Sequence, residues 1–226
     1  MSIEANLKRL RERIERAAER AGRNPEEIEL VVVTKTVVGD RIKRAIECGV
    51  GSIGENRVHE ALAKQAEIGR SVKWHMVGHL QSRKVREAVK LFDMVQSVES
   101  LSTARALQKR CSEIGSIMPV LIEVNTSGEE QKYGVSPDDA ESLIQEVAGM
   151  SNVRIHGLMT MAAFVPDPEE ARPSFRRLRE LGERLRERDI EGARFDVLSM
   201  GMTNDFEVAI EEGSTMLRIG TAVFAE

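Results

Sequence analysis

Lys35 is the first residue of this sequence whose type and position could do chemistry. It follows residues 31–34, an apolar and β-branched run typical of a strand buried on both faces. An ammonium group there must reach water along its flexible stem or lose its charge through a lowered pKa. A neutral lysine amine is a nucleophile that forms a Schiff base with a carbonyl compound. On this segment alone, the solvated lysine is the simpler interpretation.

Two segments near the C-terminus carry residues that suit an anion. Ser199 offers a hydroxyl, and Gly201 permits a close approach of the backbone. Gly220 and Thr221 offer a second amide and a second hydroxyl. The same glycines are compatible with plain turns. Whether the segments form a site depends on the elements that position them.

Those elements alternate along the whole chain. A helix with an apolar stripe opens the sequence and ends before Pro25. Eight apolar runs then predict strands, and the amphipathic stretches between them predict helices. The predicted strands are residues 30–35, 52–55, 74–78, 94–98, 120–125, 155–161, 195–200 and 216–224. The predicted helices after the first are residues 40–49, 57–68, 83–91, 100–114, 138–148, 169–188 and 205–212.

Eight strand–helix units without a linker predict an α/β fold, a single (β/α)8 TIM barrel domain over residues 1–226 with an extra N-terminal helix. The alternative is a doubly wound open sheet. That fold usually opens on a glycine-rich turn after a strand, and no G-x-G-x-x-G follows a predicted strand here. The barrel is therefore the favoured architecture.

In such a barrel the active site forms at the carboxyl ends of the strands. Strand eight pairs with strand one when the barrel closes, so Gly220 and Thr221 are expected beside Lys35. Barrels often hold a phosphate with the loops after strands seven and eight, which adds Ser199 and Gly201 to the predicted phosphate site. A lysine amine and a phosphate site across one seam suit pyridoxal 5′-phosphate (PLP).

Two further residues are predicted to face this cofactor. Arg218 shares the face of Gly220 on the last strand, so it should point inward beneath the phosphate, toward the pyridine ring. Met200 is predicted to line the pocket. His75 and His79 lie four residues apart, but no acidic or cysteine side chain is spaced to complete a metal site. No metal is expected.

Eight segments along the chain match one known family. They are VTKT (33–36), GENR (54–57), WHMVGHLQ (74–81), VNTSGE (124–129), GLMTM (157–161), LSMGM (198–202), NDFEVAI (204–210) and RIGT (218–221). On these segments the chain resembles the YggS/PROSC family, the pyridoxal phosphate homeostasis proteins, over nearly its full length. The resemblance implies a fold-type III barrel like the N-terminal domain of alanine racemase, with PLP held as a Schiff base on Lys35. It implies phosphate contacts from Ser199, Gly220 and Thr221, with Arg218 near the pyridine nitrogen. Asn56 and His79 match pocket positions of the family.

Binding PLP does not make an enzyme. An arginine beside the ring nitrogen disfavours its protonation and weakens the cofactor as an electron sink. Racemisation also needs a second acid–base group, which alanine racemases take from a C-terminal domain that this sequence lacks. Tyr133 is the only tyrosine, and a loop anchor is its simpler role. We expect a PLP carrier in PLP homeostasis, without robust catalysis and with no catalytic residue assigned. The alternatives are a weak PLP-dependent amino-acid racemase and an aldolase-type enzyme that uses Lys35 without PLP.

Composition excludes several other classes. The net charge of −4 gives no support for nucleic-acid binding, and no apolar run reaches the length of a membrane span. The start of the chain does not read as a signal peptide, and two cysteines are too few for a disulfide framework. We expect a cytoplasmic monomer whose partners are PLP and PLP-dependent apoenzymes.

Overall fold

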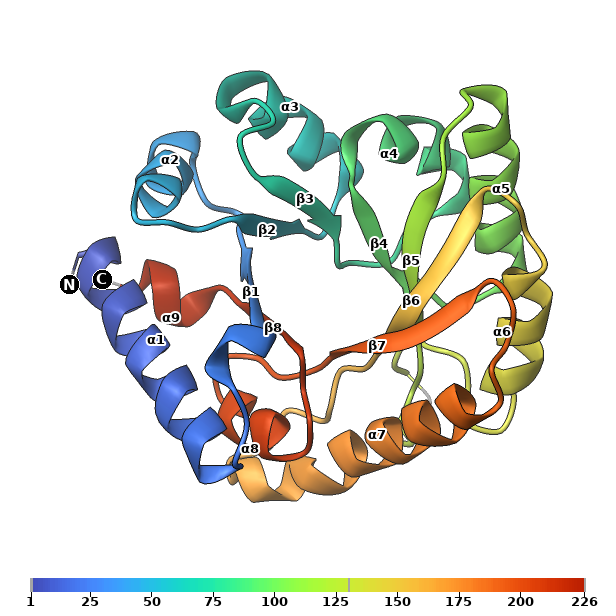
Figure 1. Cartoon of the computed structure of the whole chain (residues 1–226). Helices are drawn as coiled ribbons and strands as arrows, with labels where there is room; N and C mark the ends of the chain where they lie inside the picture. The colour runs from blue at the N-terminus through green and yellow to red at the C-terminus, as the bar shows by residue number, and fades with distance from the viewer. Residues whose placement is uncertain (1, 130, 226) are drawn as a thin grey trace.

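Eight parallel strands close into a barrel in the order β1 to β8, and β8 pairs with β1 (Figure 1). The computed structural model describes residues 2–129 and 131–225. The β1–β8 register sets Val31 opposite Arg218 and Val32 opposite Ile219, so the predicted seam forms. The strands are β1 (Glu29–Val33), β2 (Ser52–Glu55), β3 (Lys73–Met76), β4 (Met94–Val98), β5 (Met118–Glu123), β6 (Val153–Met159), β7 (Ala193–Ser199) and β8 (Met216–Ile219).

Helices surround the barrel, and the extra N-terminal helix α1 packs against α8 and α9 near the seam (Figure 1). The helices are α1 (Ile3–Arg20), α2 (Gly39–Glu47), α3 (Val58–Ile68), α4 (Val85–Leu91), α5 (Leu101–Glu113), α6 (Ala140–Ala148), α7 (Arg172–Glu187), α8 (Phe206–Glu211) and α9 (Thr221–Phe224). Three short 3₁₀ turns are η1 (Pro25–Glu27), η2 (Ser82–Lys84) and η3 (Pro168–Ala171). The predicted barrel with its added helix is confirmed.

Two predicted boundaries are wrong in ways that affect the site. Strand eight was predicted to reach residue 224, but it ends at Ile219 and the chain turns at Gly220 into α9. The apolar residues of α9 pack against α1 instead of extending the strand. Strand one ends at Val33, so Lys35 lies in a turn rather than in the strand. Both changes move predicted site residues out of the strands, Lys35 into a turn and Thr221 into α9.

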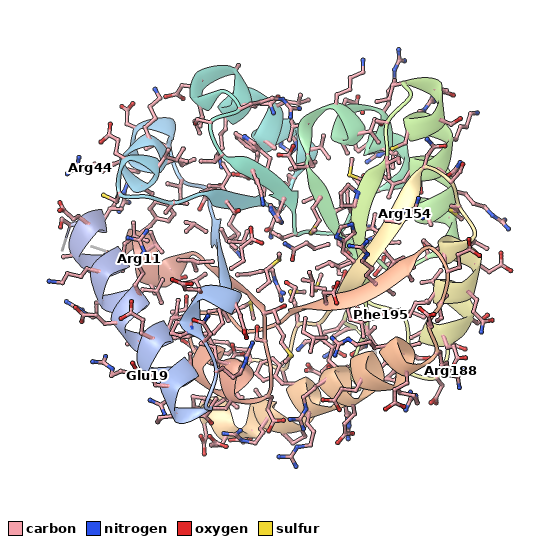
Figure 2. All side chains as sticks on the ribbon, viewed as in Figure 1. Arg11, Glu19, Arg44, Arg154, Arg188 and Phe195 are labelled. Atoms are coloured by element: carbon pink, nitrogen blue, oxygen red, sulfur yellow. The ribbon has the colours of Figure 1, made fainter. Side chains whose placement is uncertain are left out.

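The hydrophobic core has two parts. The larger part lies between the strands and the helices and includes Trp74, Leu107 and Phe175. A small cluster fills the barrel, with Val31 and Met159 among its members. Side chains occupy the space inside the strand ring, so the barrel is a packed core and not a pore (Figure 2). This core sets the floor beneath the functional rim.

Candidate functional site

A cavity of about 670 Å³ opens at the carboxyl ends of β1, β7 and β8 and below the loop that follows β6. It lies at the rim where the active sites of such barrels form. Its lining is polar on the side of β7 and β8 and more apolar beside the loop after β6. The lining residues are Val33, Lys35, Thr36, Val37, Ala163, Phe164, Val165, Met202, Thr203, Asn204, Asp205, Arg218, Gly220, Thr221, Phe224 and Ala225.

Lys35 enters this cavity from a tight turn. A hydrogen bond of 3.0 Å from the Val37 amide to the Thr34 carbonyl closes the turn around Lys35 and Thr36. Thr36 has a φ of +62°, a left-handed conformation that is unusual for a β-branched residue. The Thr36 hydroxyl donates to the Lys35 carbonyl at 2.6 Å. Lys35 is exposed, so the structure presents a solvated amine and not the buried ammonium that a strand position would have produced.

The segments after β7 and β8 meet across the cavity. Gly220 lies so close to β1 that a Cβ atom there would be 2.7 Å from the Val33 carbonyl oxygen. The Ala222 amide donates to the Thr203 hydroxyl at 3.4 Å, which joins the two segments directly. Thr203 therefore lies beside Thr221, although we did not predict it as a site residue. The hydroxyl four residues after Ser199 was the available signal.

Arg218 supplies the positive charge of the cavity floor. Its side chain is only 4% exposed, and burial lowers its pKa to about 10, so it stays charged at neutral pH. Nη1 donates to the Ser199 hydroxyl at 2.5 Å, and Nη2 donates to the Thr160 carbonyl at 2.8 Å. The predicted inward position of Arg218 agrees with this placement.

Ser199 lies below the cavity and does not line it, so its contact with a phosphate stays a prediction. It is fully buried, does not line the cavity, and donates to Gln96 Oε1 at 2.7 Å while it accepts from Arg218. Gln96 Nε2 in turn lies 2.9 Å from His75 Nδ1. A chain of buried polar side chains thus runs downward from the arginine through the barrel. This chain holds the guanidinium in place, and Thr203 is the hydroxyl after β7 that lines the cavity.

Gly201 and Met200 also lie away from the cavity. Met200 is fully buried in the outer hydrophobic core and does not line this cavity. A Cβ atom on Gly201, which has a φ of +98°, would lie 2.7 Å from Ala209 Cβ. The glycine therefore permits the close packing of α8 at the end of β7, and its contact with a phosphate stays a prediction.

Asn56 and His79 lie at the same rim of the barrel but outside this cavity. His79 Nδ1 is 2.8 Å from Glu99 Oε1, and its ring stacks on Tyr133 with centroids 4.5 Å apart. Glu99 also accepts from the Gly134 amide at 2.9 Å. These contacts fasten the loop after β5 to the ends of β3 and β4. The six remaining predicted positions are therefore divided, with Lys35, Arg218, Gly220 and Thr221 in the cavity and Asn56 and His79 beside it.

Two buried carboxyl groups near the site have raised pKa values. Burial, with the negative charge of Glu99, raises the pKa of Glu123 to about 7, and Arg218 opposes this shift. Burial also raises the pKa of Asp205, whose Oδ1 accepts from the Met202 amide at 2.6 Å. Neither residue was predicted, because an isolated acidic residue at a strand end carries no distinctive pattern.

The described residues contain no group of three or more His, Cys, Asp or Glu side chains arranged to hold a metal ion. In the same part of the chain, no helix is both long enough and apolar enough to cross a membrane.

A closed barrel with an amine in the turn after β1 and hydroxyl-bearing segments after β7 and β8 defines a class of protein. The family model for the alanine racemase N-terminal domain matches residues 5–226. Within that class, the chain belongs to the family of the pyridoxal phosphate homeostasis proteins. It is 42% identical to the pyridoxal phosphate homeostasis protein of Aquifex aeolicus over 221 residues, which cover 97% of this chain and 96% of that one. It is 38% identical to the protein of the same name from Pseudomonas aeruginosa, over 99% of this chain and 95% of that one.

A solved structure is also similar to this chain over most of its length. PipY of Synechococcus elongatus, determined with PLP bound, is 32% identical, with a TM-score of 0.82. The similarity covers 94% of this chain and 100% of PipY.

Proposed function

We propose that this protein holds PLP as a Schiff base on Lys35 and acts in the intracellular homeostasis and carriage of PLP. The observation that carries the proposal is the presence in one cavity of the Lys35 amine, the Arg218 guanidinium and the joined segments at Thr203 and Thr221. The PLP-bound structure of PipY and the name that the curated relatives share support it.

The residues present fit this cofactor. The close approach of Gly220 to Val33, which a Cβ atom would prevent, brings the start of α9 beside the end of β1. The hydroxyls of Thr203 and Thr221 and the nearby amides are the donors that a phosphate requires. Lys35 supplies the amine in the same cavity, with no hydrogen bond or ion pair to its Nζ among the described contacts. PLP bound here would supply an aldehyde to that amine and an electron-withdrawing ring.

Arg218 argues for carriage over catalysis. Its charge is held on the cavity floor at neutral pH by bonds to Ser199 and Thr160. A permanent cation near the ring nitrogen disfavours the protonated pyridine on which carbanion stabilisation depends. The curated relatives are named as homeostasis proteins. We therefore infer that the protein has no robust catalytic activity of its own and passes PLP to apoenzymes.

The test is an absorbance spectrum of the protein with PLP, before and after borohydride reduction, followed by peptide mapping. We expect a reduced adduct on Lys35, and the Lys35→Ala variant should show none. An adduct on another lysine in the wild-type protein would overturn the site assignment. Absence of any adduct would favour the aldolase-type use of Lys35.

One observation favours the racemase alternative. Because Glu99 engages His79 Nδ1, the other ring nitrogen of His79 is left to act as an acid or base at the rim. If the protein were a racemase, it would exchange the α-proton of an amino acid with deuterated water at a useful rate. Exchange that disappears in His79→Gln would replace the carrier proposal with this one. The cytoplasmic location and monomeric state expected from the sequence stay predictions.

A further inference from the structure

A buried ion pair lies directly behind the turn that carries Lys35, and the proposed function does not explain it. Glu55, at the end of β2, is fully buried, and the Lys64 side chain on α3 is only 13% exposed. Lys64 Nζ lies 2.6 Å from Glu55 Oε1. Neither residue lines the cavity. Removing two charges from water is costly, and packed apolar side chains often give equal stability. Stability alone therefore does not account for the pair.

The pair converges on Thr34, the residue before Lys35. The Thr34 hydroxyl donates to Glu55 Oε1 at 2.5 Å, and its amide donates to the Gly54 carbonyl at 2.9 Å. Lys64 Nζ donates to the Thr34 carbonyl at 2.7 Å. The amide, the hydroxyl and the carbonyl of Thr34 are thus all held. A hydrophobic pair of the same size could not hold the carbonyl.

The same carbonyl closes the turn. It accepts from the Val37 amide at 3.0 Å, across a turn in which Thr36 has a φ of +62°. A β-branched residue in this conformation persists only where its surroundings determine the backbone. Lys64, on a helix outside the barrel, thus donates to the Thr34 carbonyl oxygen, the same atom that accepts the hydrogen bond closing the turn. Glu55 fixes the direction of the Lys64 side chain and leaves its own Oε2 buried without a hydrogen-bond partner among the described residues, a cost that a purely structural pair would not need.

We propose that Glu55 and Lys64 are positioning residues that hold the turn of residues 34–37 and thereby aim the Lys35 amine into the cavity. The inference deepens the proposed function and rests on it. Glu55 orients Lys64, Lys64 fixes the Thr34 carbonyl, and the fixed carbonyl sets the direction in which Lys35 leaves β1. The reacting lysine can then be exposed and still have a defined direction.

The test compares Lys64→Met, the double variant Glu55→Gln/Lys64→Met and Lys64→Arg with the wild type. The first measurement is the rate at which PLP becomes trapped by borohydride on Lys35. The second is hydrogen exchange of the Val37 amide in cofactor-free protein. We expect trapping to slow roughly tenfold or more in the first two variants, because small misplacements of a reacting group are costly. Exchange at Val37 should accelerate by about the same factor. Lys64→Arg should keep most of both properties, because a guanidinium can donate to the same carbonyl.

Glu212→Gln is the matched control. Glu212 is also buried and ion-paired, with Arg172 and Arg176 of α7, but none of these residues lines the cavity. This variant should melt at a lower temperature and trap PLP at the wild-type rate.

The double variant Glu55→Gln/Lys64→Met leaves no uncompensated charge, so it would restore the stability lost in Lys64→Met if the pair were purely structural. Wild-type exchange at Val37 in the double variant would overturn the inference. Failure of the wild-type protein to trap PLP on Lys35 would instead overturn the proposed function.

Discussion

Arg218 Nη1 and Ser199 Oγ are joined by a hydrogen bond of 2.5 Å inside the barrel, below the cavity that the arginine lines. The serine therefore supports the charge of the cavity without lining the cavity itself. Hydrogen bonds to charged groups are shorter and stronger than neutral ones. The position of the guanidinium thus depends on a residue below the cavity.

Replacing Ser199 by alanine should destabilise the cofactor-free protein. The change removes the acceptor of a buried charged donor and leaves Gln96 Oε1 without its donor. We expect a loss of about 1–3 kcal/mol in the free energy of unfolding, measured with urea. Binding of inorganic phosphate should weaken far less than in variants of the cavity threonines. A variant with normal stability but no phosphate binding would return Ser199 to the phosphate site.

Variants of Thr203 and Thr221 test whether the hydroxyls that line the cavity bind the phosphate of PLP. Thr203→Val and Thr221→Val each keep the side-chain shape and remove a hydroxyl from the cavity wall. We expect each to weaken PLP binding roughly tenfold, which corresponds to the loss of one hydrogen bond to a charged group. Pyridoxal, which has no phosphate, is the control ligand, and its binding should not change. Equal losses for PLP and pyridoxal would place the phosphate elsewhere.

Lys35→Ala should leave the fold intact. The side chain is exposed and has no described ion pair, so its removal should change the free energy of unfolding by less than about 0.5 kcal/mol. Thermal melting of the cofactor-free protein checks this. A large loss would mean that the lysine is a structural element of the turn and not only a reactive group presented by it.

Glu123 gives the protein a measurable dependence on pH. Its pKa in the folded state, about 7, is above its ordinary value of 4.5. Between these values the folded state keeps a proton that the unfolded state has lost, so stability falls as the pH rises through this window. The shift corresponds to a contribution on the order of 3 kcal/mol. Glu123→Gln should remove this dependence and be more stable than the wild type at pH 8, with little difference at pH 4. The same difference in the free energy of unfolding between wild type and Glu123→Gln at pH 4 and pH 8 would contradict the placement of this carboxyl.

The barrel and the seam could be predicted because both rest on periodic patterns. Eight apolar runs separated by amphipathic stretches admit few arrangements, and closure of the barrel sets strand eight beside strand one. Lys35 and Gly220 were therefore placed at one cavity correctly, since each follows a strand end that is visible in the sequence. Because side chains alternate between the two faces of a strand, Arg218 was also predicted to point into the barrel. In the structure it lies opposite Val31 of β1.

The remaining site residues could not be predicted, because their roles depend on depth and on side-chain direction. Ser199 and Thr203 both carry hydroxyls near the end of β7, and only the point at which the strand stops decides which one reaches the cavity. The link between Lys64 and Thr34 joins a helix to a strand end 30 residues away. A lysine on an amphipathic helix normally faces water, so nothing in its spacing indicated a buried contact.

The last prediction concerns the proton on His75, and it follows from the direction of the polar chain below Arg218. Arginine has donors only, so Ser199 Oγ must accept from it and can donate its own proton to Gln96 Oε1. The amide nitrogen of Gln96 then faces His75 Nδ1 and donates to it.

His75 must therefore carry its proton on Nε2, which is buried without a hydrogen-bond partner in the described structure. Burial lowers the pKa of His75 below 6.5, so the folded state keeps the ring neutral where the unfolded state would protonate. Stability attributable to this ring should fall as the pH drops below 6.5. Nitrogen NMR shifts of His75 should show the neutral Nε2–H form at pH 6.5. In Ser199→Ala the chain loses its fixed direction, and the shifts should indicate a mixture of tautomers. A protonated ring, or the Nδ1–H form, in the wild type would mean that Arg218 does not orient this chain.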